Sequence, residues 1–220
     1  MMPPGQIFIF SAPSGGGKST IIGELRKRIA GLGYAVSHTS RPPREEERDG
    51  VHYYFVDRGT FERMIGQGAF VEWAPVYDAL YGTSFMTLEE QTAKGLDVVM
   101  DVDVQGARSI RRRFPESVSI YIVPPSIASL AARLRSRGTD SESAVERRLR
   151  AAAGEIHHSL EYDYIIVNHL LEDAVKEAEA IILAGRCRTA RREMSVRRAF
   201  PESFAPVSEL MKDTGLGTEG

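Results

Sequence analysis

A run of glycines followed by lysine, serine and threonine is the feature that most restricts how this chain can fold. The run follows an apolar segment at 6–10 and precedes a helical pattern, and it reads Ser-Ala-Pro-Ser-Gly-Gly-Gly-Lys-Ser-Thr at 11–20. Glycines let backbone N–H groups close around phosphate oxygens, a lysine reaches the outer phosphates, and a hydroxyl can ligate Mg²⁺. A helix beginning here also turns its positive dipole end toward an anion. The run therefore predicts a phosphate-binding loop between a strand and a helix.

This loop departs from the strict pattern G-x-x-x-x-G-K-S at one position, where Ala12 replaces the first glycine. Alanine adds only a methyl group, so the expected cradle of N–H groups stays intact. A glycine-rich turn can also simply join a strand to a helix. The order Lys18-Ser19-Thr20 directly after the third glycine favours phosphate binding over that simpler interpretation.

Length and composition limit the other possibilities. The chain has 220 residues, of which 42% are hydrophobic, and this suffices for one sizeable core with small insertions. A formal net charge of -2 gives no electrostatic footprint for nucleic acid. No apolar run approaches the roughly 18 residues that span a bilayer, the first residues lack the basic start of a signal peptide, and the single Cys187 suits a reducing compartment. We expect a cytoplasmic protein that binds neither nucleic acid nor membrane.

Apolar segments that alternate with helical patterns predict an α/β fold, a doubly wound parallel sheet around the phosphate-binding loop. The run Ile7 to Phe10 is typical of a buried central strand. Further strands are predicted at 34–37, 96–100, 118–123 and 162–167, and a last amphipathic helix at 170–183. The helix after the loop should bury one face, formed by Ile21, Ile22, Leu25 and Ile29.

Two excursions should interrupt the core, which we expect at about 5–40, 95–125 and 158–186. A small α+β insertion at about 41–90 would hold strands at 51–55 and 69–73 around a helix at 57–67, which Asp57 or Thr60 would cap. Helices at about 126–157 would form a lid. The tail, 187–220, begins with arginines and becomes polar, and we expect it to be mobile.

Polar residues stand at the carboxyl ends of the predicted strands, where doubly wound sheets bind ligands. They are Ser11, Ser37, Asp101 and Asn168. An apolar strand that ends in aspartate is typical of the group that holds a magnesium-bound water opposite the loop hydroxyl, and either Asp101 or Asp103 fits that role. Aspartate is also common in strand-end turns, and without the upstream loop the two interpretations would be equally good.

Three charged features permit a simpler interpretation as well. Residues 39–50 combine prolines with dense charge, which is typical of a solvated surface loop. Arginines dominate two helical pieces, 133–138 and 140–153, and a solvated helix face would explain them. Glu72 lies in the otherwise apolar Phe-Val-Glu-Trp strand at 70–73, where alternation could turn it to solvent.

Taken together, these motifs resemble the guanylate kinase family in its compact bacterial form. The resemblance covers about residues 5–186. It rests on the loop at 11–20 and on motifs at 37–44, 50–53, 70–73, 81–83, 101–106, 137–139, 148–149 and 162–164, all in the family's order. Ser40 and Glu46 depart from the family's usual threonine and glycine, which affects the shape of the loop at 44–50.

The resemblance implies a phosphotransferase that converts GMP to GDP with ATP and Mg²⁺. By this resemblance GMP phosphate would be bound by Arg41, Arg44, Tyr53 and Tyr81, and guanine by Ser37, Glu72, Thr83 and Asp103. The catalytic charges would be Lys18, Arg41, Arg137 and Arg148, and the metal would be held by Ser19 and, through water, by Asp101. ATP would be bound by Ser11, Ala12, Pro13, Ser14, Gly15, Gly16, Gly17, Lys18, Ser19, Thr20 and Asn168.

The residue chemistry agrees, because phosphoryl transfer depends on positioning and charge neutralisation, and arginine suits phosphate well. Two alternatives remain. A kinase for another small acceptor or a GTPase would share the loop, although the Asn-Lys-x-Asp signature of GTPases is absent from the sequence. A binding module built on the same fold would typically lack a working loop, whereas Lys18 and Ser19 are present.

Overall fold

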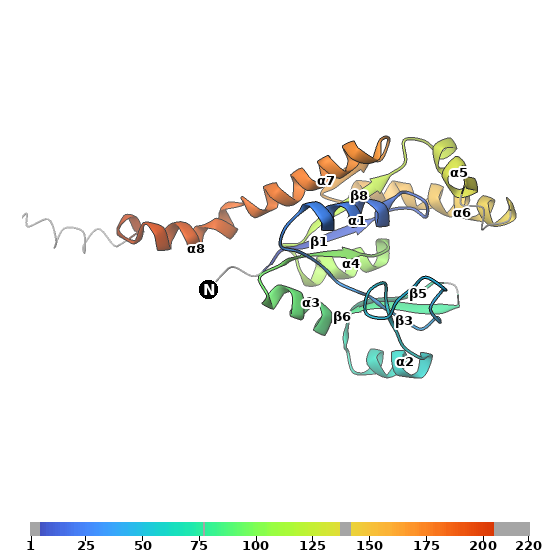
Figure 1. The fold of residues 1–220 in the computed structure, drawn as a ribbon, viewed down its shortest axis with the longest axis horizontal. Coiled ribbons are helices and arrows are strands. Elements are labelled where there is room, and N and C mark those ends of the chain that lie inside the picture. The colour runs from blue at the N-terminus through green and yellow to red at the C-terminus, as the bar shows by residue number, and fades with distance from the viewer. Residues whose placement is uncertain (1–4, 77, 137–141, 205–220) are drawn as a thin grey trace, which may run out of the picture.

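Five parallel strands form the main sheet of the computed structural model, which describes residues 5–76, 78–136 and 142–204 (Figure 1). The central strand is β1 (Ile7–Ser11), which pairs with β7 (Asp97–Asp101) on one side and β8 (Val118–Val123) on the other. It is buried throughout, as its unbroken apolar run predicts. The order across the sheet is β2 (Leu32–Tyr34), β7 (Asp97–Asp101), β1 (Ile7–Ser11), β8 (Val118–Val123) and β9 (Tyr164–Val167).

Helices cover both faces of this sheet. On one face α1 (Lys18–Arg28) and α7 (Leu171–Arg186) pack over Phe8 and Phe10, and on the other α3 (Phe85–Ala93) and α4 (Val104–Arg113) pack over Ile7 and Ile9. Successive side chains of β1 thus serve opposite cores, as strand alternation requires. This arrangement confirms the predicted doubly wound fold. The predicted helix face is confirmed too, since all four of its members are buried: Ile21, Ile22, Leu25 and Ile29.

A second, smaller sheet occupies the region where an α+β insertion is predicted. Its strand order is β4 (Tyr54–Phe55), β3 (His38–Thr39), β6 (Ala79–Ser84) and β5 (Phe70–Val76). Helix α2 (Arg58–Gly66) packs on it through Phe61, whose ring stacks on Phe70 at 4.4 Å. The cap of α2 is Asp57, whose carboxylate accepts from the Thr60 backbone N–H at 2.8 Å. Of the two cap residues weighed, Asp57 is therefore the one used.

Several predicted strands are wrong in extent, among them 162–167, of which only Tyr164–Val167 forms a strand. Residues 34–37 were expected to form one strand, but β2 ends at Tyr34 and β3 begins at His38, because the chain crosses from the main sheet to the small sheet between them. The strand predicted at 51–55 keeps only its last two residues. Its first part is a turn, in which the backbone N–H groups of Val51 and His52 donate to the Arg48 carbonyl. Strand β6 and helix α3 were not predicted as separate elements.

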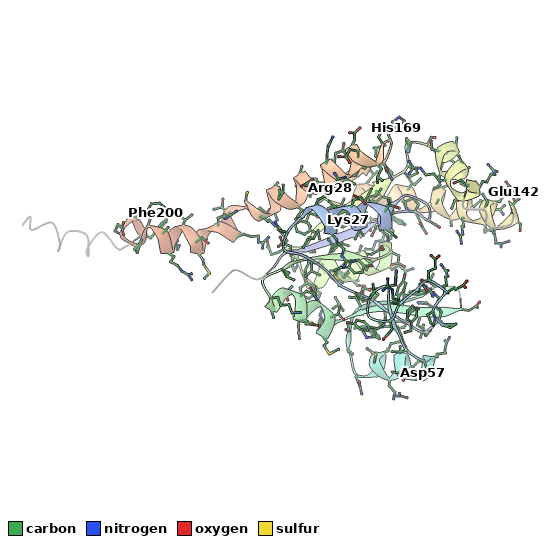
Figure 2. All side chains as sticks on the ribbon, in the orientation of Figure 1. Lys27, Arg28, Asp57, Glu142, His169 and Phe200 are labelled. Atoms are coloured by element: carbon green, nitrogen blue, oxygen red, sulfur yellow. The ribbon has the colours of Figure 1, made fainter. Side chains whose placement is uncertain are left out.

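Helices form both ends of the molecule. At one end α5 (Ile127–Ser136) and α6 (Glu142–Ile156) pack through a small apolar cluster that includes Leu130 and Leu134, and η1 (His157–Glu161) follows. At the other end α8 (Thr189–Ala199) leads from α7 away from the body, and Phe200 lies near its tip (Figure 2). The sequence did not predict α8, since none of its residues is buried, and η2 (Pro201–Phe204) follows it. No helix of the described residues is long and apolar enough to cross a membrane.

Candidate active site

The phosphate-binding loop joins β1 to α1 with a backbone that only glycine adopts easily. Gly15 and Gly17 have φ angles of 89° and 96°, in the left-handed region. The N–H of Gly16 closes a turn onto the Pro13 carbonyl at 2.9 Å. Gly17 caps α1, and among the described residues no side chain bonds to the first N–H groups of that helix. These N–H groups are therefore available to an anion.

Close packing adds a second reason for these glycines. A Cβ atom at Gly15 would lie 2.9 Å from Leu130 Cδ1, and one at Gly17 would overlap the side-chain nitrogen of Asn168. Ala12 fits because Gly16 lies beside it, where a second Cβ would be only 3.0 Å from the Ala12 methyl. The substitution noted in the sequence is therefore accommodated by the neighbouring glycine.

Lys18 is held at the edge of the main sheet. Its Nζ lies 2.5 Å from Asp101 Oδ1 and donates to the Val102 carbonyl at 3.1 Å. Asp101 is the last residue of β7, directly beside Phe10 of β1, so two neighbouring strand ends bring these opposite charges together. Ser19, the next residue of α1, is exposed.

Ser19 and Asp101 carry oxygen atoms of the kind that ligate Mg²⁺. Mg²⁺ prefers oxygen ligands, and in nucleotide sites it takes one or two from the protein and the rest from phosphates and water. The exposed Ser19 hydroxyl and the partly exposed Asp101 carboxylate provide such donors. Within the described residues, no three His, Cys, Asp or Glu side chains are grouped to hold a metal by themselves. The site thus fits a metal that arrives with a nucleotide.

Ser11 and Asn168 contact the protein backbone around the loop. The Ser11 hydroxyl donates to the Val102 carbonyl at 2.9 Å, and the Asn168 Nδ2 donates to the Gly16 carbonyl at 2.9 Å. The Asn168 Oδ1 is buried and has no partner among the described residues. Both side chains therefore brace the loop, and their predicted contact with ATP stays a prediction.

Arg41, Tyr53 and Tyr81, which the resemblance assigns to one phosphate, lie together. Arg41 Nε donates to the Tyr81 hydroxyl at 3.0 Å, and the guanidinium lies 5.2 Å from the centre of the Tyr53 ring. The two tyrosine rings meet edge to face at 5.7 Å. Burial raises the pKa of Tyr53 above its ordinary value, so this hydroxyl is a donor at neutral pH. Arg44, the fourth member of the set, is exposed.

The residues predicted to read guanine form a buried hydrogen-bonded chain. Glu72 on β5 faces Thr83 on β6, whose hydroxyl donates to Glu72 Oε1 at 2.7 Å. Because Thr83 has one hydroxyl hydrogen, Ser37, at 3.0 Å, must be the donor to Thr83. Burial, with Asp103 adding to it, raises the pKa of Glu72 to about 7. Glu72 is thus an inward-facing carboxylate, and its interpretation as a solvent-facing residue is wrong.

Asp103 is the N-cap of α4, where its Oδ1 accepts from the Gly106 N–H at 2.8 Å. Gly106 also leaves room for Glu72, since a Cβ there would lie 3.0 Å from Glu72 Oε2. The two aspartates that the sequence left open thus differ in surroundings. Asp101 pairs with Lys18 of the loop, and Asp103 lies close enough to Glu72 to raise its pKa.

Helices α5 and α6, where a lid is predicted, contribute residues that the predictions missed. Arg133 on α5 donates to the Asn168 carbonyl at 2.7 Å and approaches the position of Gly17. Its spacing of four residues from Arg137 was a usable signal, because such residues share a helix face. Glu155 on α6 is also drawn into the site, and burial, with Asp103 nearby, raises its pKa. Arg148 is half-buried on α6, and Arg137 lies outside the described residues.

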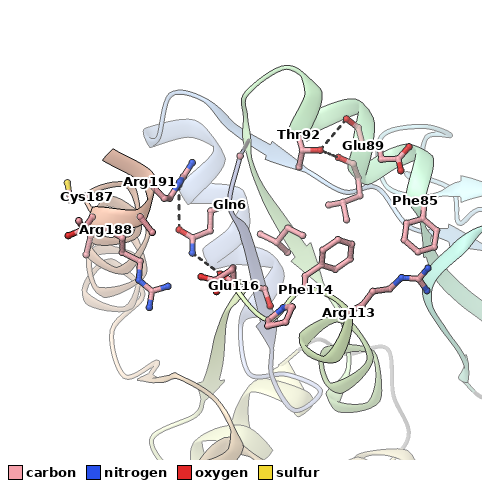
Figure 3. A pocket seen from close by; sticks show the side chains of 18 residues that line it. Gln6, Phe85, Glu89, Thr92, Arg113, Phe114, Glu116, Cys187, Arg188 and Arg191 are labelled. Carbon is pink, nitrogen blue, oxygen red and sulfur yellow. Dashed lines mark hydrogen bonds between the residues drawn. The ribbon is translucent and has the colours of Figure 1, made fainter. Parts of the chain in front are cut away.

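A cavity of about 1260 Å³ lies at the opposite end of the main sheet and takes no part in this site (Figure 3). Its lining includes Gln6, directly before β1, and Ile7, the first residue of that strand, whereas the loop follows the end of the strand. Phe85, Phe114 and Arg191 line other parts of it. None of the residues assigned to nucleotide binding lines this cavity.

Comparison with known proteins assigns the chain to a family. The guanylate kinase family model matches residues 5–184. The guanylate kinase of Geobacter sulfurreducens is 47% identical over 191 residues, which are 87% of this chain and 94% of that protein. The guanylate kinase of Neisseria gonorrhoeae is 47% identical over 85% of this chain and 90% of its own length. The crystal structure of guanylate kinase from Anaplasma phagocytophilum superposes with a TM-score of 0.72 at 33% identity, covering 90% of this chain and 96% of that one. The chain therefore belongs to the guanylate kinase family and is a phosphotransferase.

Proposed function

We propose that this enzyme transfers the terminal phosphoryl group of ATP, with Mg²⁺, to the phosphate of GMP and releases ADP and GDP. The observation that carries the proposal is the buried chain of Ser37, Thr83 and Glu72, which offers carboxylate oxygens to a base with adjacent N–H donors. Guanine has such donors at N1 and N2, and adenine has a lone pair at N1. We expect the enzyme to act in the cytoplasm, in purine nucleotide metabolism and the recycling of GMP.

The donor would bind at the loop. Backbone N–H groups of residues 14–20 would hold the ATP phosphates, because the first turn of α1 has no side-chain cap. Lys18 would leave its ion pair with Asp101 and stabilise the charge on the phosphoryl group during transfer. Ser19 and, through water, Asp101 would hold Mg²⁺, which supplies charge neutralisation between the outer phosphates. Ser11 and Asn168 would support the loop from behind.

The acceptor would bind on the small sheet. Arg41, Arg44, Tyr53 and Tyr81 would take the phosphate of GMP, and Ser37, Glu72, Thr83 and Asp103 the guanine. Two phosphates of like charge must approach each other, so the cationic groups of the lid, Arg133, Arg137 and Arg148, would neutralise the developing charge. No general base is required, because the acceptor oxygen already belongs to an ionised phosphate.

Closure would bring the two halves together. We propose that residues 41–90 act as the GMP-binding insertion and 126–157 as the lid, and that both move toward the loop when ATP and GMP are bound. Exclusion of water from the transferring group is the physical reason, since water would otherwise compete as acceptor.

A coupled assay of ADP release with four acceptors tests the proposal. We expect rapid turnover with GMP and, because a mispaired buried carboxylate costs about 3 kcal/mol or more, at least about 100-fold lower kcat/KM with AMP. CMP and UMP should be poor acceptors as well. Turnover with AMP that equals or exceeds turnover with GMP would show that the enzyme is a kinase for another monophosphate. ADP release that none of the four acceptors accelerates would refute the proposal.

A further inference from the structure

Glu47 closes the loop that provides the proposed phosphate-binding arginines, and the proposed function gives it no role. Its two carboxylate oxygens accept from Nη1 and Nη2 of Arg41 at 2.6 and 2.7 Å. Its Oε2 also accepts from the backbone N–H of Arg44 at 2.9 Å. Arg41 and Glu47 are only 17% and 15% exposed at their side chains. One carboxylate therefore fixes both the guanidinium of Arg41 and the backbone of Arg44.

The remaining contacts of Arg41 show which edge of its guanidinium stays available. A guanidinium has N–H donors on Nε, Nη1 and Nη2 in one plane. Nε donates to the Tyr81 hydroxyl at 3.0 Å, and Nη1 also donates to the Pro42 carbonyl at 2.9 Å. Among the described residues, one N–H of Nη2 has no partner. Since Glu47 holds the Nη1–Nη2 edge, this N–H lies on the Nε side, next to the Tyr81 hydroxyl.

The Tyr81 hydroxyl lies beside the available N–H of Arg41 Nη2. Its oxygen accepts from Arg41 Nε, and its own hydrogen, which has no acceptor among the described residues, can donate to an anion. The rings of Tyr53 and Phe55, centred 5.2 and 5.7 Å from the guanidinium carbon, limit how the plane of Arg41 can turn. The Nη2 N–H and the Tyr81 O–H together form a seat for phosphate oxygens.

We infer that Glu47 is a positioning residue for the acceptor phosphate: it clamps the Nη1–Nη2 edge of Arg41 so that the remaining Nη2 N–H and the Tyr81 hydroxyl face that phosphate. The inference rests on the proposed function, because it requires GMP as the ligand. Bidentate pairing suits this task, since it fixes the orientation of the guanidinium as well as its location.

A competing role for Glu47 predicts the opposite sign. A carboxylate that merely occupied the phosphate seat would leave when GMP binds, and its removal would strengthen GMP binding. The contacts favour the clamp. The Glu47 N–H donates to the Arg44 carbonyl at 3.0 Å while its side chain receives the Arg44 N–H. The carboxylate is thus built into the turn, and displacing it would open the loop.

Steady-state kinetics of Glu47→Gln, with Glu46→Gln as the matched control, tests the inference. Glu47→Gln keeps the shape and removes the charge, so we expect KM for GMP to rise about tenfold or more, with a smaller fall in kcat. KM for ATP should stay within about twofold, because the donor loop is a separate element. Glu46 is exposed, so its variant should match the parent. Glu47→Asp, which keeps the carboxylate, should recover part of the loss.

Each other outcome overturns the inference. A lower KM for GMP in Glu47→Gln would show that Glu47 is an occupant of the seat, and an unchanged KM would show that it has no role there. Equal losses for ATP and GMP, with a lower unfolding temperature and no recovery in Glu47→Asp, would show a purely structural role. If the parent enzyme turns over GMP normally, these results refute the clamp alone. If the parent does not accept GMP, the proposed function and the clamp fall together.

Discussion

The donor loop and the acceptor side are built in different ways. The loop presents the backbone N–H groups of one contiguous stretch, shaped by glycines with positive φ, to the proposed ATP phosphates. The proposed acceptor side would bind through side chains from several strands and loops, among them Glu72 and Arg41, which Glu47 holds in place. Backbone groups do not titrate and lie where the chain places them. Side chains must be ionised and oriented by neighbours, so the acceptor side should be the more sensitive to pH and to single substitutions nearby.

Lys18→Ala should have the largest effect, because Lys18 is the loop side chain that we propose to meet the developing charge. We expect kcat to fall by about 10²- to 10³-fold with unchanged circular dichroism, as when one preorganised charge-stabilising group is removed. Lys27→Ala is the matched control, since Lys27 lies in the last turn of the same helix and is exposed (Figure 2). Near-normal turnover in Lys18→Ala would contradict the assignment of the loop.

Glu72→Gln should impair the use of GMP and leave the binding of ATP nearly unchanged. The amide replaces one acceptor oxygen with a donor, so we expect kcat/KM for GMP to fall by about 100-fold, while KM for ATP changes less than about twofold. Glu62→Gln on α2 is the control, because its side chain is exposed and pairs only with Arg58 within the described residues. A variant that phosphorylates GMP as well as the parent would mean that Glu72 does not read guanine.

A pH series should separate the two sides further. Burial raises the pKa of Glu72 to about 7, and only the ionised form offers both oxygens as charged acceptors to the guanine N–H donors. We therefore expect kcat/KM for GMP to fall as the pH drops below about 7, by up to about tenfold per unit. The phosphate of GMP titrates nearby, at about 6, so Glu72→Gln measured with the same substrate is the reference. An identical acidic limb in parent and variant would assign the titration to GMP.

The smallest expected effect is a change in overall size. If the insertion and the lid close over the loop, small-angle scattering should give a smaller radius of gyration with a bisubstrate analogue than with ATP or GMP alone. The analogue engages both sides at once, and each single nucleotide engages one. An unchanged radius of gyration at a saturating concentration of the analogue would contradict the proposed closure.

The sequence was informative where a physical requirement is local. The buried strand at β1, the one-sided helix α1 and the glycine loop each follow from residues next to each other, and the structure confirms the first two and the loop's glycine backbone. The crossing from β2 to β3 was missed, since apolar residues continue across it while the partner sheet changes. Helix α8 was missed because it buries no side chain.

Side-chain partners were the least predictable part of the site. The chain from Ser37 through Thr83 to Glu72 depends on the register of β5 and β6, which spacing alone does not fix. The pairing of Arg41 with Glu47 spans only six residues, yet nothing in the charged loop distinguishes Glu47 from its neighbours at 45 and 46. The brace between Asn168 and Gly16 joins distant segments and becomes visible only in three dimensions.

That brace has a consequence for the order of synthesis. The Asn168 amide supports the Gly16 carbonyl from 152 positions further along the chain, directly after the last strand of the main sheet. A chain that emerges amino end first therefore contains the whole glycine loop long before the residue that braces it has been added. Arg133 on α5 donates to the Asn168 carbonyl, so this contact of α5 also forms only after Asn168 has been added. The nascent enzyme should gain its ATP site in one step, when β9 docks at the edge of the sheet.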